Sequence, residues 1–277
     1  MAEKLRKRFR MVKIKYFQPL SFLNAKRQNC TCDDLWSGLE DALRNNSQAK
    51  FWWRDDDVGL TNSSCLIGLK RTWRLNKILA LLSKYSIPGV YAVIPKKFIS
   101  KGKVSIRILK RYGAYVAVHG ITHTNYSEGN GSEFPDGCDI EANAKTIIDY
   151  YNEFSKIFGN RLLPVFVPPW NNICKELEDR LLDYEFSTSK LNKAESHNAL
   201  NVDIDFINWT THKLREEKEI LKEIISLLGR RAKSIGFNNH FRYNDKETFK
   251  FFDKLFNTMQ RCNCEWFIPV RTITNQV

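Results

Sequence analysis

Three consecutive aspartates, Asp55, Asp56 and Asp57, directly follow the apolar run 51–53. Their carboxylates repel one another, and burying one without a partner is costly. A metal ion or a proton-transfer role would offset this cost. An aspartate-rich turn that caps a helix is the simpler alternative, but it does not account for three aspartates in succession after a strand-like segment.

Two histidines, His119 and His123, are four residues apart in the segment HGITHTN. This separation lets two imidazoles converge on one metal ion when the intervening residues make a helical turn. An aspartate from another strand would complete a three-ligand site, which leaves a position open for water, as in catalytic zinc sites. The alternative is a pair of loop histidines bonded to backbone or solvent. The carboxylates at a matching strand end favour the metal site.

The aspartates and a later histidine could divide the chemistry of such a site. One aspartate would bind the metal and a second would act as general base toward water, whose pKa a bound metal lowers to about 7. The third would support the site through hydrogen bonds. His240, in NNHFRYND, could protonate a leaving group, although a bond to Asp245 or to backbone is its alternative. We expect His197 and His212 to be structural or peripheral.

Strand-like and helix-like segments alternate after about residue 45. The expected strands are 50–54, 89–94, 114–118, 164–167, 186–189, 206–209, 234–237 and 266–270, and the expected helices are 69–85, 104–112, 140–158, 175–182, 214–228 and 246–261. This alternation predicts parallel strands joined by helical crossovers. Seven or eight units in roughly 230 residues favour a (β/α) barrel, with a doubly wound sheet as the alternative. Both folds place chemistry at the carboxyl ends of strands, where the aspartates, HGITHTN, PPWNN and NNHFRYND all fall.

The composition is that of a soluble protein of one large domain or two small ones. The chain has 277 residues, of which 43% are hydrophobic and 27% charged. No stretch approaches the roughly 20 apolar residues of a membrane helix. The basic start, MAEKLRKRFRMVKIKYFQPL, has no continuous apolar segment, so we expect no secretory signal and a cytoplasmic location. We expect a basic extension over 1–45 and a catalytic barrel domain over 46–277.

The net charge is +13, with 44 basic and 31 acidic side chains. Such an excess favours an anionic partner, either nucleic acid, an acidic membrane surface or a phosphate-bearing substrate. No nucleic-acid reader motif is present, so we do not expect specific nucleic-acid binding. Peripheral contact with an anionic membrane stays open, and the sequence does not indicate an oligomeric state.

The seven cysteines are odd in number and scattered, which does not indicate a disulfide framework. The pairs Cys30/Cys32 and Cys262/Cys264 could form a four-thiolate zinc site if the chain ends meet. Their one-residue separation is shorter than in most structural zinc sites. Reduced, ordinary cysteines are therefore the preferred interpretation.

These motifs, in this order, resemble those of the polysaccharide deacetylase superfamily. RDDDV at 54–58 resembles the family's TFDDG motif, HGITHTN its HxxxH motif, and VPPWN at 167–171 its RPPYG motif, while His240 matches a late strand-end histidine. The variants are most similar to the subgroup of surface-polysaccharide and lipopolysaccharide biosynthesis. The resemblance runs from about residue 50 to the end of the chain.

The resemblance implies a distorted (β/α) barrel of seven or eight strands and metal-dependent removal of N- or O-acetyl groups from sugars. It makes Asp56 the base, and it makes Asp57, His119 and His123 the metal ligands. An alignment shifted by one would assign the base and the ligand to Asp55 and Asp56 instead. The cofactor would be one divalent ion, zinc first, with cobalt, nickel or manganese as alternatives.

The third motif would contribute to the oxyanion and acyl sites. Backbone N–H groups around Pro169 and Trp170 would stabilise the oxyanion, the Trp170 ring would line the acyl pocket, and Asn171 would lie beside it. The family's arginine is replaced here by Val167, and Arg54 could supply the missing positive charge. The segment HNALNVDIDFINW could add Asp205, or Asp203, to the rim.

The substrate class implied is an N-acetylated sugar or glycan. Without a secretion signal, a cytoplasmic intermediate is favoured over a wall polymer, and a lipid- or nucleotide-linked sugar would suit the positive charge. The alternatives are a metal-dependent amidase or esterase acting on a non-sugar substrate, and a non-catalytic glycan-binding protein on the same fold.

Overall fold

The protein is built around one parallel sheet. The computed structural model describes residues 31–59, 66–101, 103–129, 131–192 and 199–269. The strand order is β5-β4-β3-β2-β1-β9-β6, and β10 pairs with the start of β1. The strands are β1 (Lys50–Val58), β2 (Gly89–Val93), β3 (Tyr115–His119), β4 (Leu162–Val167), β5 (Ser187–Thr188), β6 (Ile204–Asp205), β9 (Ser234–Asn239) and β10 (Glu265–Trp266).

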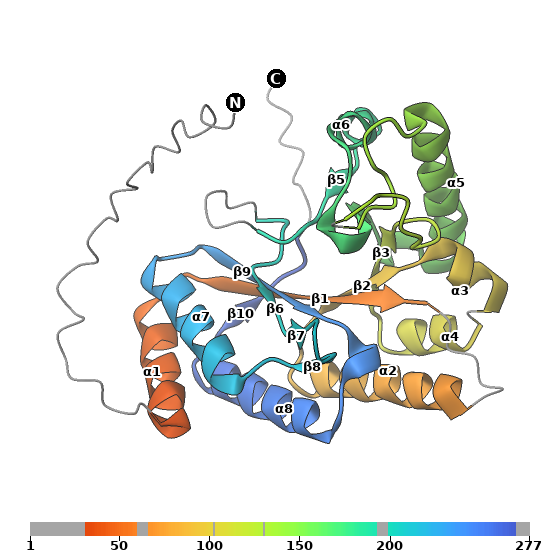
Figure 1. Cartoon of the computed structure of the whole chain (residues 1–277). Coiled ribbons are helices and arrows are strands. Elements are labelled where there is room, and N and C mark those ends of the chain that lie inside the picture. The colour runs from red at the N-terminus through yellow and green to blue at the C-terminus, as the bar shows by residue number, and fades with distance from the viewer. Residues whose placement is uncertain (1–30, 60–65, 102, 130, 193–198, 270–277) are drawn as a thin grey trace, which may run out of the picture. The chain divides into compact units, whose positions relative to one another are not determined.

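The sheet curls into a distorted barrel. A single parallel bridge between Leu191 and Val202 joins the segment after β5 to the segment before β6, so the two outer strands of the sheet approach each other. Helices cover the outside of the curl (Figure 1). The predicted distorted (β/α) barrel is therefore confirmed.

Eight α-helices lie in the described part of the chain. They are α1 (Cys32–Asn45), α2 (Leu66–Lys84), α3 (Pro95–Lys101), α4 (Lys103–Arg111), α5 (Ile140–Phe158), α6 (Lys175–Asp183), α7 (Glu217–Gly229) and α8 (Lys246–Arg261). All six predicted helices are present, with ends shifted by a few residues at most. Short 3-10 turns, η1 (Gly159–Arg161), η2 (Pro169–Asn171) and η3 (Phe241–Tyr243), follow α5, β4 and β9. No helix in the described ranges combines the length and apolarity needed to cross a membrane.

Three predicted strands differ from the structure, the last of which, predicted over 266–270, is only the two-residue β10 at Glu265–Trp266, with residue 270 outside the described residues. β1 does not end at Arg54 but continues through the three aspartates to Val58, and every residue after Lys50 is buried. The predicted strand 206–209 is wrong, because Ile204–Asp205 pairs with β9 instead. Residues Ile207–Asn208 (β7) form a small antiparallel hairpin with Lys213–Leu214 (β8), outside the main sheet. The Asn208 side chain starts this hairpin turn by accepting the N–H groups of residues 210 and 211.

Helix α1, which precedes residue 46, belongs to the same compact unit as the barrel. Helix α1 packs against the barrel because its apolar stripe, including Leu39, is buried. Its Trp36 indole donates to Glu217 at the start of α7, at 2.6 Å, and its ring lies 5.9 Å from that of Phe251 in α8. Residues 1–30 of the predicted extension lie outside the described residues.

An aromatic core holds β1 in place. The Trp53 ring lies 5.6 Å from Phe206, 5.1 Å from Phe252 and 5.4 Å from Phe256, and all four side chains are buried. Aromatic pairs at these separations contribute beyond their buried area. The strand that carries the aspartates is therefore anchored on both its sheet neighbours and α8.

Candidate metal and acid–base site

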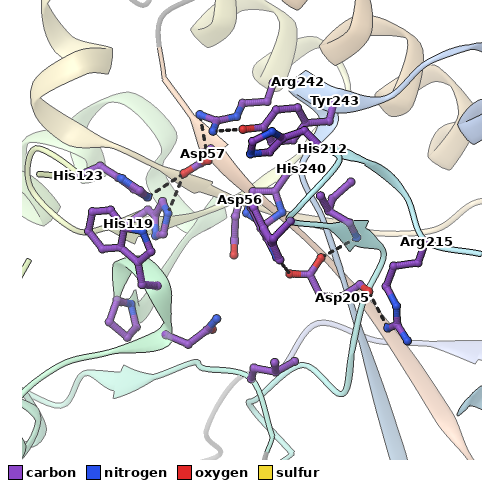
Figure 2. Close-up of a pocket in the computed structure, with 16 residues that line it drawn as sticks. Asp56, Asp57, His119, His123, Asp205, His212, Arg215, His240, Arg242 and Tyr243 are labelled. Carbon is purple, nitrogen blue, oxygen red and sulfur yellow. Dashed lines mark hydrogen bonds and ion pairs between the residues drawn. The ribbon is translucent and has the colours of Figure 1, made fainter. Parts of the chain in front are cut away.

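The carboxyl ends of four strands meet around one pocket (Figure 2). β1 ends in the aspartates, β3 in His119, β4 in the Pro-Pro-Trp-Asn segment and β9 in His240. The cavity has a volume of about 790 Å³ and is lined by Asp56, Asp57, His119, His123, Pro168, Trp170, Asn171, Leu191, Asp205, Ile207, Trp209, His212, Arg215, His240, Arg242 and Tyr243.

Asp57, His119 and His123 form a potential metal site. Asp57 Oδ1 lies 3.2 Å from His119 Nε2 and 3.0 Å from His123 Nε2, and the three ligand atoms lie within 4.8 Å of one another. The other ring nitrogen of His119, Nδ1, lies 2.8 Å from the Val167 carbonyl, which can only accept, so Nδ1 carries a proton. His119 Nε2 can therefore donate to Asp57 only when the ring is a protonated imidazolium, whereas in the neutral ring the Nε2 lone pair faces the carboxylate and repels it. A shared cation removes this repulsion, so the donor set fits a divalent metal.

A buried glutamate, Glu133, shapes the loop that carries His123. Its carboxylate accepts the backbone N–H groups of Ile121, Thr122 and His123, at 3.0, 2.6 and 3.1 Å. A Cβ on Gly120, which has φ 59°, would collide with Glu133 Oε2. The expected helical turn is therefore wrong: the histidines converge through a loop in which Gly120 and His123 both have left-handed φ.

The backbone of Asp57 brings two successive aspartates to the same pocket. Neighbouring residues of a regular strand point to opposite faces. Asp57 instead has φ 61°, and the pairing with β2 is irregular between Asp55 and Val58. Asp56 and Asp57 therefore both line the pocket, whereas Asp55 does not.

Asp56 has one paired and one unpaired oxygen. Its Oδ2 accepts a 2.8 Å hydrogen bond from Arg54 Nη2, while its buried Oδ1 has no partner. Arg54 is fully buried and also donates to the Ser189 hydroxyl at 2.8 Å. Arg54 does not line the pocket. Its positive charge therefore acts on the pocket only through its ion pair with Asp56.

Asp55 and Asp57 have opposite electrostatic environments. Burial raises the pKa of Asp55 well above its usual range, although Asn239 Nδ2 and the Phe241 N–H donate to it at 2.7 and 2.8 Å. These bonds tie β1 to the segment around His240. For Asp57 burial also opposes ionisation, but the hydrogen bonds of His119 and His123 outweigh it and hold the pKa well below its usual value.

His240 lines the same pocket as Asp56, His119 and His123 (Figure 2). Its Nδ1 has no hydrogen-bond partner, and its ring lies 4.6 Å from that of Trp209. Burial lowers the pKa of His240, while the carboxylates of Asp56 and Asp57 oppose this shift. Asp205 also lines the pocket and accepts the Trp209 indole N–H at 3.1 Å.

The third motif forms the wall next to His123. The Trp170 ring lies 4.3 Å from the His123 ring and remains 41% exposed, and Trp170 and Asn171 both have left-handed φ, 55° and 56°. Pro169 is buried against Gly120 and is not exposed to the pocket. The Asn171 Oδ1 is buried without a partner.

Sequence reasoning missed several pocket residues. Arg242 Nη1 lies 3.1 Å from Asp57 Oδ2, and its position two residues after His240 was the available signal. His212, expected to be peripheral, lines the pocket and stacks on Tyr243 with ring centroids 4.8 Å apart. Arg215 and Trp209 join the lining through the β7–β8 hairpin, which has no motif of its own.

The cysteines give no sign of a second metal site in the described ranges. The metal-ligand cluster found there is the Asp57 group. Cys30, required for the four-thiolate alternative, lies outside the described residues, and the Cys32 thiol donates to Glu217 at 3.1 Å.

Comparison with known proteins identifies the fold. No protein-family model and no curated protein matches the sequence. The crystal structure of a putative polysaccharide deacetylase from Mycobacterium smegmatis matches with a TM-score of 0.56, 13% identity, and coverage of 80% of this chain and 87% of that one. The fold is that of the polysaccharide deacetylases. The predicted resemblance is confirmed at this level.

Two further structures bear on the range of proteins with this fold. A family 4 carbohydrate esterase from Streptomyces lividans, in complex with acetate, matches with a TM-score of 0.50 and 14% identity over 80% of this chain and 94% of that one. A family 4 pseudoenzyme from Bacillus anthracis matches with a TM-score of 0.51 and 12% identity over 78% of this chain. The chain spans 62% of the length of that pseudoenzyme.

Proposed function

We propose that the protein is a metal-dependent hydrolase that removes an N-acetyl group from a sugar or glycan. The observation that carries this proposal is the meeting of the Asp57, His119 and His123 ligand atoms with Asp56 and His240 in one pocket. The deacetylase fold of the neighbouring structures supports the same reaction class.

Asp57, His119 and His123 would hold the ion, with zinc first and cobalt, nickel or manganese as alternatives. A divalent ion held there supplies Lewis acidity, which lowers the pKa of water and polarises an acyl carbonyl. The hydrogen bond from His119 Nδ1 to Val167 fixes the ring in the tautomer that such a site needs. The loop bonds to Glu133 hold His123 in position.

Asp56 is the general base in this proposal. Its Oδ1 has no partner within the protein, so it can accept a proton from attacking water, while Arg54 holds Oδ2. His240, with its unpaired Nδ1, would donate a proton to the departing amine. Asp55 would link β1 to the segment around His240 and take no part in proton transfer.

The remaining site residues would bind the acyl group and the sugar. Backbone N–H groups of the segment around Pro169 and Trp170 would stabilise the oxyanion, and the exposed Trp170 ring would cover the acyl methyl group. Asn171 and Asp205 would hydrogen-bond sugar hydroxyls from the rim. A sugar intermediate of surface-polysaccharide biosynthesis in the cytoplasm, linked to a lipid or nucleotide, is the substrate proposed.

A non-catalytic glycan-binding protein is the second candidate, because a pseudoenzyme is among the structures that share the fold. A protein that only binds glycans would need the pocket. It would not need a buried, unpaired Asp56 oxygen close to the three potential metal ligands Asp57, His119 and His123. The two candidates differ in turnover. A non-sugar amidase or esterase would differ in substrate alone.

Metal content and acetate release test the proposal together. The wild-type protein should hold about one equivalent of divalent metal and release acetate from members of an N-acetylsugar panel. His119→Ala should lose both, while His212→Ala, which changes a pocket histidine outside the ligand set, should keep its metal. Metal without acetate from any sugar would favour the binder or a non-sugar substrate. A wild-type protein that takes up no metal after reconstitution would contradict the proposed site.

A further inference from the structure

Two blocks of the sequence carry its excess positive charge: residues 1–30, with nine basic residues and one acidic residue, and residues 58–127. Residues 58–127 include 12 of the 44 basic residues and none of the 31 acidic ones. Outside both blocks the sequence has 23 basic and 30 acidic residues, so residues 31–277 carry their positive excess in the block 58–127. This block contains α2, α3 and α4, and α2 lies against α4. The helices between β1 and β3 thus form a basic sector of the barrel.

An exposed apolar patch lies at the start of this sector. Ten large hydrophobic side chains are exposed in the described part of the chain, and four of them fall within the first eight residues of α2. They are Leu66, Ile67, Leu69 and Trp73, with exposed fractions of 85%, 65%, 51% and 52%. A contiguous group of exposed apolar side chains marks an interaction surface more often than scattered ones do.

The helix presents these residues together with lysines. Leu66, Leu69, Lys70, Trp73 and Lys77 follow the helical spacing of three and four, so they share one face. The Lys77 ammonium lies 4.8 Å from the centre of the Trp73 ring. This face is opposite the buried stripe of α2.

The basic residues near the patch are not neutralised by acidic partners. None of the ion pairs in the described ranges involves Lys70 or Arg71 of α2, or Arg107 or Lys110 of α4. By contrast, Lys84 at the far end of α2 pairs with Asp253 at 2.7 Å. Lys70 and Arg71 are therefore unneutralised beside the apolar start of the helix, and Arg107 and Lys110 add positive charge on the neighbouring α4.

The patch lies at the same edge of the barrel as the pocket. β1 ends at the aspartates, and the next element, α2, begins at that edge and runs back along the sheet (Figure 1). Near the pocket, Arg74 of α2 donates to the carbonyl of Arg242 in η3. A surface docked at the start of α2 would therefore lie at the edge of the barrel that holds the pocket.

We propose that the apolar start of α2 and the basic residues of α2 and α4 form a docking site for an anionic lipid membrane surface. Leucine, isoleucine and tryptophan side chains enter the boundary between headgroups and acyl chains, and surrounding lysines and arginines bind anionic headgroups. Tryptophan in particular favours this boundary. An acidic protein surface would pair with the lysines and arginines. It would not by itself bury the exposed apolar side chains of Leu66 and Ile67.

Vesicle co-sedimentation of the full chain tests this docking site. The protein should sediment with phosphatidylcholine vesicles that contain phosphatidylglycerol and should stay in solution with phosphatidylcholine alone. The double variant Leu66→Ser/Ile67→Ser should lower the partition constant by about tenfold or more. The double variant Lys70→Glu/Arg71→Glu should lower it by a similar factor, and added salt should weaken wild-type binding.

Matched variants elsewhere control for general effects. Leu182→Ser/Tyr184→Ser changes two exposed side chains at the end of α6, and Lys156→Glu/Lys222→Glu makes the same change in net charge on α5 and α7. Both should stay within about twofold of wild type. Equal losses in patch and control variants would overturn the proposal, as would no binding to anionic vesicles at low salt.

Sedimentation equilibrium identifies a competing occupant. A wild-type dimer that Leu66→Ser/Ile67→Ser dissociates, without vesicle binding by either form, would assign the patch to a second copy and overturn the membrane site. These assays need neither metal nor turnover. Their outcome is therefore independent of the proposed deacetylase activity.

Discussion

Arg54 and Asp56, two residues apart on the same strand, form a buried ion pair with a nitrogen–oxygen distance of 2.8 Å. The pair leaves one oxygen of Asp56 without a partner. Arg54 therefore holds a buried positive charge beside Asp56 from within β1 itself. Two predictions concern this pair.

Removing one partner of the pair should cost more stability than removing both charges. Arg54→Met leaves an uncompensated carboxylate among buried groups, so we expect a loss of about 3–5 kcal/mol in the free energy of unfolding. In Arg54→Met/Asp56→Asn that charge is also gone, and part of the loss should be recovered. Urea unfolding of the single and double variants measures the coupling. Strictly additive effects would show that the two side chains do not stabilise each other.

Asp56 and Asp57 should fail in different ways when neutralised. Asp56→Asn should keep its metal but lose acetate release by about 10²–10⁴-fold, the usual contribution of a general base. Asp57→Asn should lose the metal itself. Metal analysis alongside acetate release on each variant separates these roles. Retained metal in Asp57→Asn together with lost metal in Asp56→Asn would reverse the assignment.

Glu133 should control metal affinity without contacting the metal. Glu133→Gln replaces one acceptor oxygen with an NH₂ group that faces the backbone N–H groups of residues 121–123, so the loop cannot keep its form. We expect metal affinity to fall about 10–100-fold, as for other residues that orient ligands. Chelator competition measures this loss.

The control for Glu133 is Glu178→Gln. Glu178 lies on α6 and is held by Lys190 at 2.7 Å, away from the pocket lining. It should leave metal affinity unchanged. If both variants lose affinity alike, general destabilisation rather than loop positioning would explain the result.

Asp245 should make stability depend on pH in the acidic range. It caps α8, and burial is outweighed by its hydrogen bonds with Thr248, which lower its pKa. Because the pKa is lower in the folded state, the stabilisation is present above the unfolded value of about 3.9 and is lost as the pH falls through the folded value.

The matching variant is Asp245→Ala, which removes the cap. It should cost about 1 kcal/mol at neutral pH, and the difference from wild type should shrink below about pH 4. Thermal unfolding at several pH values checks this. A difference that stays constant down to strongly acidic pH would show that the ionised carboxylate is not the stabilising form.

The sequence by itself determined the fold class and the membership of most of the site. Alternating apolar patterns predict parallel strands with crossovers, and the ends of such strands must share one edge. Asp57, His119, His123 and His240 therefore follow from local pattern and topology. Apolar periodicity and the position of a residue at a strand end both depend on residues that are close together in the sequence, so the sequence alone predicts them.

Only the tertiary structure decided which way individual side chains point. The left-handed backbone at Asp57 brings two adjacent aspartates into the pocket and sends Asp55 out of it. Glu133, ten residues after His123, replaces the expected helical turn by bonding three backbone N–H groups. Arg242 and His212 enter through contacts between distant segments. Side-chain direction depends on backbone dihedrals and partners that long-range packing selects, and no local spacing encodes that selection.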